Sequence, residues 1–295
     1  MKALEISREN GVYPIAYAKR VYAEFGVLVL KNYVPADSQV TLRRLIEAKL
    51  TDSRSRGAVV KPPIYPDAEF MLGDVLAVRE LQAFDYIFFG AECVQVIKGL
   101  LETEELLYWG DSSIQFGEAA RGFHKDNVDR SDGTGDDWSG SYGLVRCGFY
   151  FQEHAKHSGG LKVRLASHKV ANHMAGRMSD IATDYGDVVI WNMRLTHSGN
   201  NKRLRFPLRL VLHPRLEQRL PKFALASEPL RRIAAFCSFG RPGSHVDRYI
   251  ERMNSRDADY SPYFKFARKA AEAGPLVAHY GLSFRQPRQT YGELD

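Results

Sequence analysis

Two histidines and one aspartate are the residues of this chain whose types and spacing best fit a metal site. His124 and Asp126 are separated only by Lys125, and His197 follows much later in the chain. Side chains alternate along an extended strand, so His124 and Asp126 are expected to point the same way. Two neutral imidazoles and one carboxylate suit Fe(II), and three protein ligands leave coordination positions open. Taken alone, the His-x-Asp pair also fits an ordinary surface or hydrogen-bonded histidine. The surrounding sequence must therefore decide between that role and a metal ligand.

The elements expected to position these residues are short strands. From about residue 106 onward, segments rich in Val, Ile, Phe and Tyr alternate with turns, which is typical of a sandwich or barrel. These segments are 106–116, 143–152, 160–164, 187–191 and 206–213. The polar loop over 127–141 is predicted to be either disordered or a working lid.

Helical patterns flank the predicted strands. Apolar spacing predicts helices over 14–25, from 37 to about 50 and over about 75–101, with a buried strand at 27–30. Residues 228–254 and 262–273 are also predicted to be helical. The sequence therefore predicts a mainly β fold with flanking helices. We expect residues 1–220 to form the core and residues 221–295 a helical extension packed on it.

The composition is that of a globular protein with a mild excess of positive charge. The chain has 295 residues, 44% of them hydrophobic and 26% charged, with a formal net charge of +6. This charge favours anionic partners, but the basic residues form no stripe interleaved with aromatics, so no nucleic-acid partner is expected. Cys93, Cys147 and Cys237 are far apart and odd in number, which predicts a cytoplasmic protein without disulfides. No transmembrane segment or signal peptide is expected.

Three passages follow one another in an order and spacing typical of one enzyme family. They are Gly122-Phe123-His124-Lys125-Asp126, the stretch from Ser158 to Lys169, and Gly186-Asp187-Val188-Val189 through His197. Over roughly residues 20–215 they resemble the phytanoyl-CoA dioxygenase family of Fe(II)/2-oxoglutarate oxygenases. The second passage is similar to the family's Gly-Gly-x-Leu…Gly-Ser-His-Lys stretch, with Ala166 where the family usually has glycine.

The resemblance implies a double-stranded β-helix, a jelly-roll variant, with His124, Asp126 and His197 as the iron ligands. It implies 2-oxoglutarate as cosubstrate and O2 as oxidant, and ascorbate as an aid in vitro. The implied reaction releases succinate and CO2 and hydroxylates an unactivated C–H bond. Family relatives that halogenate lack the carboxylate, so by this resemblance the presence of Asp126 indicates hydroxylation or a related oxidation.

The family also has an arginine about a dozen residues after the second histidine, which holds the far carboxylate of 2-oxoglutarate. A bidentate, permanently charged partner suits a carboxylate in a partly buried pocket. Arg203, Arg205 and Arg209 share strand parity. Arg209 fits best, because it lies 12 residues after His197 and within an apolar run. Arg205 is the second candidate. An external ion pair is the other role open to Arg209.

Four further residues are candidates for ligand contacts. Gln115 and Tyr142 lie near the ligand strand and could face the cosubstrate, although a packed side chain also fits each of them. Trp138 has little core to join in its polar loop, so we predict that it covers the substrate. Arg121 precedes the ligand motif and could meet an anionic group of the substrate.

Other functional classes remain open. A jelly-roll that binds an anionic ligand or a glycan without turnover is the main alternative to an enzyme. A metal cupin such as a sugar isomerase usually has His-x-His with a following Glu, a pattern this chain lacks. The leading prediction is a hydroxylase of a small-molecule or conjugated metabolite. The sequence leaves the substrate and the oligomeric state, including a homo-oligomer, open.

Overall fold

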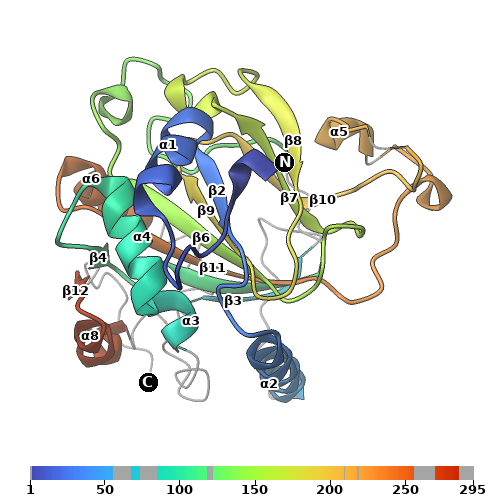
Figure 1. The fold of residues 1–295 in the computed structure, drawn as a ribbon, viewed down its shortest axis with the longest axis horizontal. Helices are drawn as coiled ribbons and strands as arrows, with labels where there is room; N and C mark the ends of the chain where they lie inside the picture. Colours follow the sequence, from blue (N-terminus) through green and yellow to red (C-terminus); the bar gives the residue numbers. More distant parts are fainter. Residues whose placement is uncertain are drawn as a thin grey trace.

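The computed structural model describes residues 2–55, 68–73, 85–117, 122–208, 210–217, 219–255 and 270–285 (Figure 1). Its α-helices are α1 (Ile15–Phe25), α2 (Ala36–Ser55), α3 (Asp85–Phe89), α4 (Ala91–Leu101), α5 (Pro214–Glu217), α6 (Ser244–Ser255) and α8 (Ala270–His279). Its strands are β1 (Glu5–Ile6), β2 (Val27–Leu30), β3 (Ala68–Gly73), β4 (Leu107–Tyr108), β5 (Ser112–Gly117), β6 (Leu144–Tyr150), β7 (Gly160–Leu165), β8 (Arg177–Ile181), β9 (Val188–Asn192), β10 (His197–Asn201), β11 (Ile233–Gly240) and β12 (Ser283–Phe284). The helices predicted before residue 102 are confirmed where they fall on described residues.

The described strands form two sheets. A nine-stranded sheet runs β1-β2-β9-β6-β11-β4-β12, with β5 beside β11 and β3 beside β5, and a three-stranded sheet runs β10-β7-β8. In the middle of the large sheet, β6 is antiparallel to both β9 and β11. Strands that follow one another in sequence, such as β6 and β7 or β9 and β10, lie in different sheets. This is the predicted double-stranded β-helix, a jelly-roll with flanking helices.

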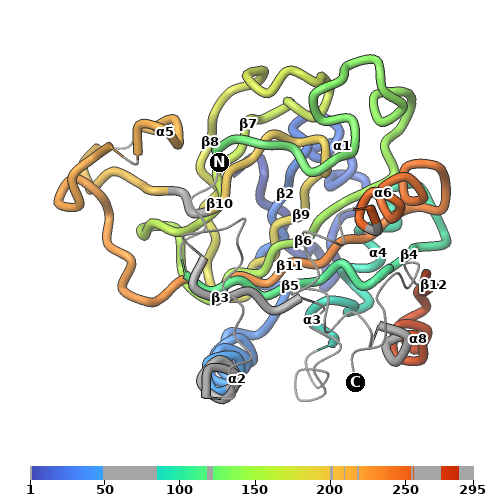
Figure 2. The backbone as a smooth tube through the Cα atoms, turned by 180° about the vertical axis from the view of Figure 1, so that it is seen from behind, coloured from blue at the N-terminus to red at the C-terminus, as the bar shows by residue number. Residues whose placement is uncertain are grey.

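The two faces of the large sheet differ in what they contact. On β6, Val145, Cys147 and Phe149 join the main hydrophobic core. Helices α1, α3 and α4 contribute to that core and lie on this face of the sheet (Figures 1 and 2). Because side chains alternate, Arg146 and Tyr150 of the same strand point the other way, into a pocket between the two sheets. The helices therefore support the sheet from one side and leave its other side for the site.

The helix predicted over 228–254 is wrong for its first half. Residues 233–240 form β11, which pairs with β6 on one side and with β5 and β4 on the other. This strand is buried on both faces, so its sequence lacks the polar alternation of a half-exposed strand, and its two alanines favour a helix locally. The boundary at residue 220 remains a proposal. The segment beyond it, however, supplies a strand to the sheet as well as the helices α6 and α8.

The strand predicted over 206–213 is also wrong within the described residues. No strand is present at 206–208 or 210–213, and Leu208 and Leu210 are 57% and 67% exposed. Pro207 cannot donate a ladder hydrogen bond, which disfavours a sheet interior. The apolar run that favoured Arg209 is therefore not a buried strand, and Arg209 itself lies outside the described residues.

Ala166 has a left-handed backbone conformation at the turn after β7, with φ of 64°. A Cβ costs roughly 1–2 kcal/mol in this region, and glycine avoids that cost while losing about 0.5–1 kcal/mol of chain entropy. We predict that Ala166→Gly raises the free energy of unfolding by about 0.5–1 kcal/mol in urea titrations. Ala16→Gly on the exposed face of α1 is the matched control and should lose about 1 kcal/mol. Destabilisation by Ala166→Gly would contradict the explanation.

His154 makes stability depend on pH. It is 1% exposed, its Nε2 accepts from the Gln152 amide, and its Nδ1 donates to the Thr183 hydroxyl. Burial lowers the pKa of His154 to about 3. The unfolded chain has the ordinary pKa of about 6.5, so it takes up a proton that the folded chain does not, and stability is lost as the pH falls from there towards 3.

Comparison with one variant isolates the contribution of His154 to the loss of stability at low pH. Between pH 7 and pH 5, the wild type should lose about 2 kcal/mol more stability than His154→Gln, whose side chain does not titrate. Denaturant unfolding at both pH values gives the difference. Equal losses in the two proteins would show that His154 is protonated in the folded state.

Candidate metal centre

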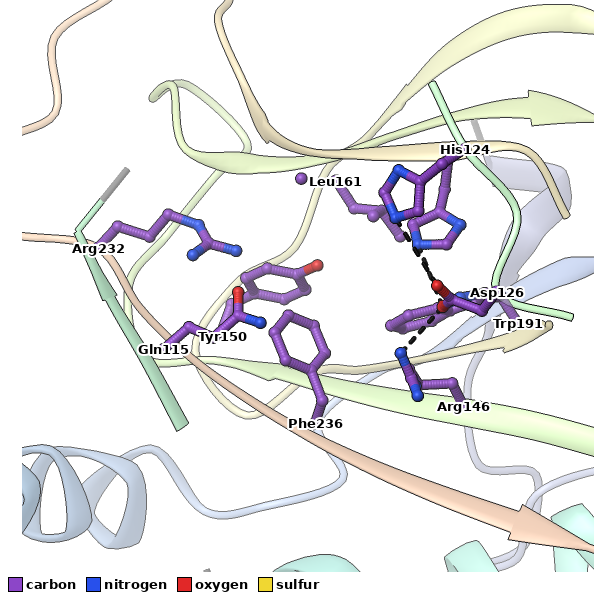
Figure 3. Close-up of a pocket in the computed structure, with 11 residues that line it drawn as sticks. Gln115, His124, Asp126, Arg146, Tyr150, Leu161, Trp191, Arg232 and Phe236 are labelled. Atoms are coloured by element: carbon purple, nitrogen blue, oxygen red, sulfur yellow. Dashed lines mark hydrogen bonds and ion pairs between the residues drawn. The ribbon is translucent and has the colours of Figure 1, made fainter. Parts of the chain in front are cut away.

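His124 and Asp126 lie at one end of the pocket between the sheets (Figure 3), and His197, the third predicted metal ligand, lies beside them. Their ligand atoms are all within 4.8 Å of one another. The Nε2 of His124 is 3.7 Å from Asp126 Oδ1, and the Nε2 of His197 is 3.4 Å from Asp126 Oδ2. A cation among these atoms would meet two nitrogen donors and one oxygen donor, which is the donor set that suits Fe(II).

Each imidazole is oriented through its other ring nitrogen. The Nδ1 of His124 is 2.9 Å from the carbonyl oxygen of Gly122, and the Nδ1 of His197 is 3.0 Å from that of Leu195. A carbonyl oxygen can only accept, so each Nδ1 carries the proton and donates it. Each Nε2 therefore has a lone pair available for a cation, which is the arrangement typical of metal-binding histidines.

Backbone hydrogen bonds hold the two histidines side by side. The N–H of His124 donates to the carbonyl of His197 at 3.0 Å, and the N–H of His197 donates back at 2.9 Å. The N–H of Asp126 donates to the carbonyl of Met193 at 2.9 Å. This antiparallel pairing joins the His-x-Asp segment to the start of β10 and sets the spacing of all three ligands.

Arg146 of β6 holds the Asp126 carboxylate from the large sheet. Its Nη1 donates to Asp126 Oδ2 at 2.9 Å, and its Nη2 donates to Asp111 Oδ2 at 2.8 Å and to the Tyr249 hydroxyl at 3.0 Å. Burial alone would lower the pKa of Arg146, but the Asp111 and Asp126 carboxylates outweigh it and raise that pKa well above its ordinary value. A carboxylate has lone pairs enough for a guanidinium and a cation together, so Asp126 is oriented and can still bind a metal.

Arg232 lies at the opposite end of the pocket (Figure 3). It directly precedes β11, is 3% exposed, and donates from Nε to the carbonyl of Gly159 at 2.9 Å. A Cβ on Gly199 would lie 3.7 Å from Arg232 Nη2. The guanidinium therefore sits beside β10, close to the residue two positions after His197.

Tyr150 lies between the two ends of the pocket (Figure 3). Its hydroxyl is buried and has no hydrogen-bond partner in the part of the chain that the structure describes. Burial raises the pKa of Tyr150 to about 12, so the hydroxyl stays protonated and can donate. A buried donor without a partner is costly, and a ligand that accepts from it would remove that cost.

Two aromatic rings line the pocket beside these polar groups. Trp191 of β9 has its ring 5.6 Å from the His197 imidazole and 6.0 Å from the ring of Phe236. A Cβ on Gly148 would lie 2.8 Å from the Trp191 ring, so glycine lets that ring lie against β6. Trp191 is thus both buried and part of the pocket wall.

The other predicted site residues have different positions. Gln115 of β5 lines the pocket. Tyr142 belongs to a second apolar cluster, and its ring is 5.0 Å from Arg194 Cζ, so it does not line the pocket. Arg205 is exposed on the surface. Arg121 lies outside the described residues, like Arg209.

Trp138 does not cover the pocket either. Its Nε1 donates to the carbonyl of Asp129 at 2.8 Å, and its ring is 5.3 Å from both Lys125 Nζ and Arg194 Cζ. Arg248 of α6 donates to both carboxylate oxygens of Asp129 at 2.8 Å. The polar loop is therefore fastened to α6, which the composition of the loop alone did not reveal.

Sequence reasoning missed three polar side chains of the pocket. Arg232 was missed because the run after it did not show the alternation of a strand. Arg146 and Tyr150 lie in a segment that was correctly predicted as a strand, at positions of the same parity. An arginine within a buried strand is costly unless it is paired, and that signal could have identified Arg146.

Comparisons with known proteins support the fold. No protein-family model matches the sequence, and no curated protein matches it. Among solved structures, AviO1 from Streptomyces viridochromogenes Tue57 is similar with a TM-score of 0.52 and 16% identity, over 78% of this chain and 96% of that one. EctD from S. alaskensis in its apoform is similar with a TM-score of 0.53 and 17% identity, over 81% of each chain.

A further crystal structure of EctD, with 2-oxoglutarate and 5-hydroxyectoine, has a TM-score of 0.51 and 15% identity, over 76% of this chain and 75% of that one. At sequence identities this low, the structural similarity shows a shared fold and nothing more. The chemistry must therefore be argued from the residues of the site. Among the described residues, every helix is too short or too polar to cross a bilayer.

Proposed function

We propose that this protein is a 2-oxoglutarate-dependent non-haem iron oxygenase that hydroxylates a small-molecule or conjugated metabolite. The observation that carries the proposal is the pocket with two unlike ends. One end has the two Nε2 atoms and the carboxylate that suit Fe(II). The other end has the buried guanidinium of Arg232, and the Tyr150 hydroxyl, which has no hydrogen-bond partner among the described residues, lies between the two ends. Both groups suit a carboxylate.

His124, Asp126 and His197 would hold the iron. The proton on each Nδ1 and the guanidinium of Arg146 orient these ligands before any cation arrives. Such preorganisation by hydrogen-bonded neighbours increases metal affinity. Three protein ligands leave positions for a chelating cosubstrate and for oxygen.

Arg232 and Tyr150 would hold the far carboxylate of 2-oxoglutarate, with Gln115 beside them. This replaces the role predicted for Arg209 and Arg205. The guanidinium donates in a fixed fork to a carboxylate, and the burial of Arg232 strengthens that interaction. A structure of the similar EctD contains 2-oxoglutarate, which agrees with this use of the fold.

The bound iron and 2-oxoglutarate supply the oxidation of a C–H bond by O2, with release of succinate and CO2. The chain's own residues bind and orient these groups, and Trp191 and Phe236 exclude water from the pocket wall. The Asp126 carboxylate occupies the position that halogenating relatives leave to a halide, which supports hydroxylation. The same residues support membership of the phytanoyl-CoA dioxygenase family.

Anaerobic metal titration tests the proposal. Fe(II), with Mn(II) as a redox-stable probe, should bind at one equivalent to the wild type and to the control His157→Ala, whose histidine is part-exposed and pairs with Glu153. His124→Ala should lose at least about 100-fold in affinity, since even indirect partners of metal ligands contribute 10–100-fold. Adding 2-oxoglutarate to the Fe(II) protein should give a charge-transfer absorption that His124→Ala lacks. Tight binding by His124→Ala, or none by the wild type, would refute the proposed site.

A further inference from the structure

The segment between β10 and β11 concentrates the positive charge of the chain. Residues 202–231 contain eight Lys and Arg residues and two Glu residues, a formal charge of +6, which equals the net charge of all 295 residues. The remainder of the chain is therefore formally neutral. Figures 1 and 2 show α5 and the turns near it projecting beyond the three-stranded sheet.

The two acidic residues of this segment are paired within the protein. Glu217 is 4% exposed and forms an ion pair with Lys162 of β7. Glu228 pairs with Lys202 at 2.6 Å. The exposed charged side chains described in this segment are all basic: Arg205, Arg215, Arg219, Lys222 and Arg231.

The same segment exposes large apolar side chains. Twelve such residues are exposed in the described part of the chain, and six of them lie between residues 206 and 230. They are Phe206, Leu208, Leu210, Leu216, Phe223 and Leu230. Exposed apolar residues gathered in one region indicate an interaction surface.

Phe206 and Phe223 lie on two chain segments that pair with each other. A bridge pairs Leu204 with Leu225, and antiparallel hydrogen bonds continue on both sides of it. Phe206 and Phe223 are two residues from this bridge on the two chain segments, so they lie at the same end of the pairing. Their exposed fractions are 78% and 75%.

We infer that the described residues of the 202–231 segment form a docking surface for an anionic phospholipid bilayer. Phe206 and Phe223 would enter the interface, while the exposed arginines and Lys222 face the lipid phosphates. Apolar side chains beside Lys and Arg are the combination by which proteins lie on a bilayer without crossing it. Each basic side chain near an anionic surface increases binding about fivefold.

Charge selects the bilayer over a second copy of this chain. A symmetric dimer through this surface would bring two segments of formal charge +6 together, and like charges oppose such a contact. An anionic bilayer is complementary to the same charge. The projecting shape also suits a deformable surface, into which side chains can insert.

Vesicle sedimentation tests this inference. The probes are phosphatidylcholine vesicles with and without phosphatidylglycerol, and the proteins are the wild type, F206S/F223S, R215E/R219E and the control V12S/V170S, whose valines are exposed elsewhere. The wild type should bind the anionic vesicles at least tenfold more tightly than the neutral ones. F206S/F223S should weaken that binding about 100-fold and R215E/R219E about 25-fold or more, while the control stays unchanged.

Far-UV circular dichroism and urea unfolding should show that all four proteins remain folded. No binding by the wild type, or equal binding by the wild type and both variants, would overturn the inference. Self-association that F206S/F223S abolishes, without vesicle binding, would assign the surface to a second copy. Binding to an oligonucleotide but not to vesicles would likewise overturn it.

Discussion

Arg232→Met is expected to weaken the binding of 2-oxoglutarate by about 100-fold or more. The variant keeps the apolar stem and removes the buried guanidinium that we propose binds the ligand carboxylate. Loss of one partner from a buried, hydrogen-bonded charge pair costs about 2–5 kcal/mol. Anaerobic titration of the metal-loaded protein with 2-oxoglutarate gives the affinity directly.

Two further variants make this prediction specific. Arg205→Met removes an exposed arginine of the original candidate set and should leave the affinity unchanged. Arg232→Lys should lie between the wild type and Arg232→Met, because lysine keeps the charge and lacks the fork. If Arg232→Met kept its affinity for 2-oxoglutarate and Arg205→Met lost it, the arginine that binds the far carboxylate would lie in the segment after β10.

Arg146→Met should weaken Fe(II) or Mn(II) binding about 10–100-fold, although Arg146 is not itself a metal ligand. Without the guanidinium, the Asp126 carboxylate loses the bond that fixes its direction. Arg146→Lys should recover part of the affinity. Arg241→Met is the control, since Arg241 donates to backbone carbonyls of Leu101 and Ser141.

A separate variant distinguishes positioning from folding. Arg146→Met also leaves the Asp111 carboxylate without its guanidinium partner, which should destabilise the protein. Adding Asp111→Asn removes that unpaired charge, so stability should recover while metal affinity stays low. Recovery of both together would show that Arg146 acts through the fold alone.

The grouping of the candidate metal ligands could be predicted in part because the signal of two of them is local. The one-residue spacing of His124 and Asp126 puts both side chains on one face of an extended segment, whatever the rest of the chain does. The pairing of that segment with His197 is a long-range contact, and it was anticipated only through the family resemblance. Strands rich in β-branched and aromatic residues, such as β6, were likewise predicted with nearly correct bounds.

The far end of the pocket could not be predicted from local pattern. The position of Arg232 is set by the strand β11 that follows it. This strand is buried on both faces, and its sequence pattern resembles that of a helix. The apolar run around residues 206–212 resembles a buried strand, yet Leu208 and Leu210 are exposed. In both cases the sequence shows how apolar a segment is, and only the tertiary structure decides whether that segment joins the sheet or an external surface.

The most direct test of the central claim is succinate formation from 2-oxoglutarate by the wild type, His197→Ala and His157→Ala. Each protein is assayed with Fe(II) and ascorbate, in air and anaerobically, without added substrate. We predict slow, oxygen-dependent succinate release by the wild type and His157→Ala, and none by His197→Ala. Absence of succinate from a folded, iron-loaded wild type, or the same rate in His197→Ala, would contradict the account.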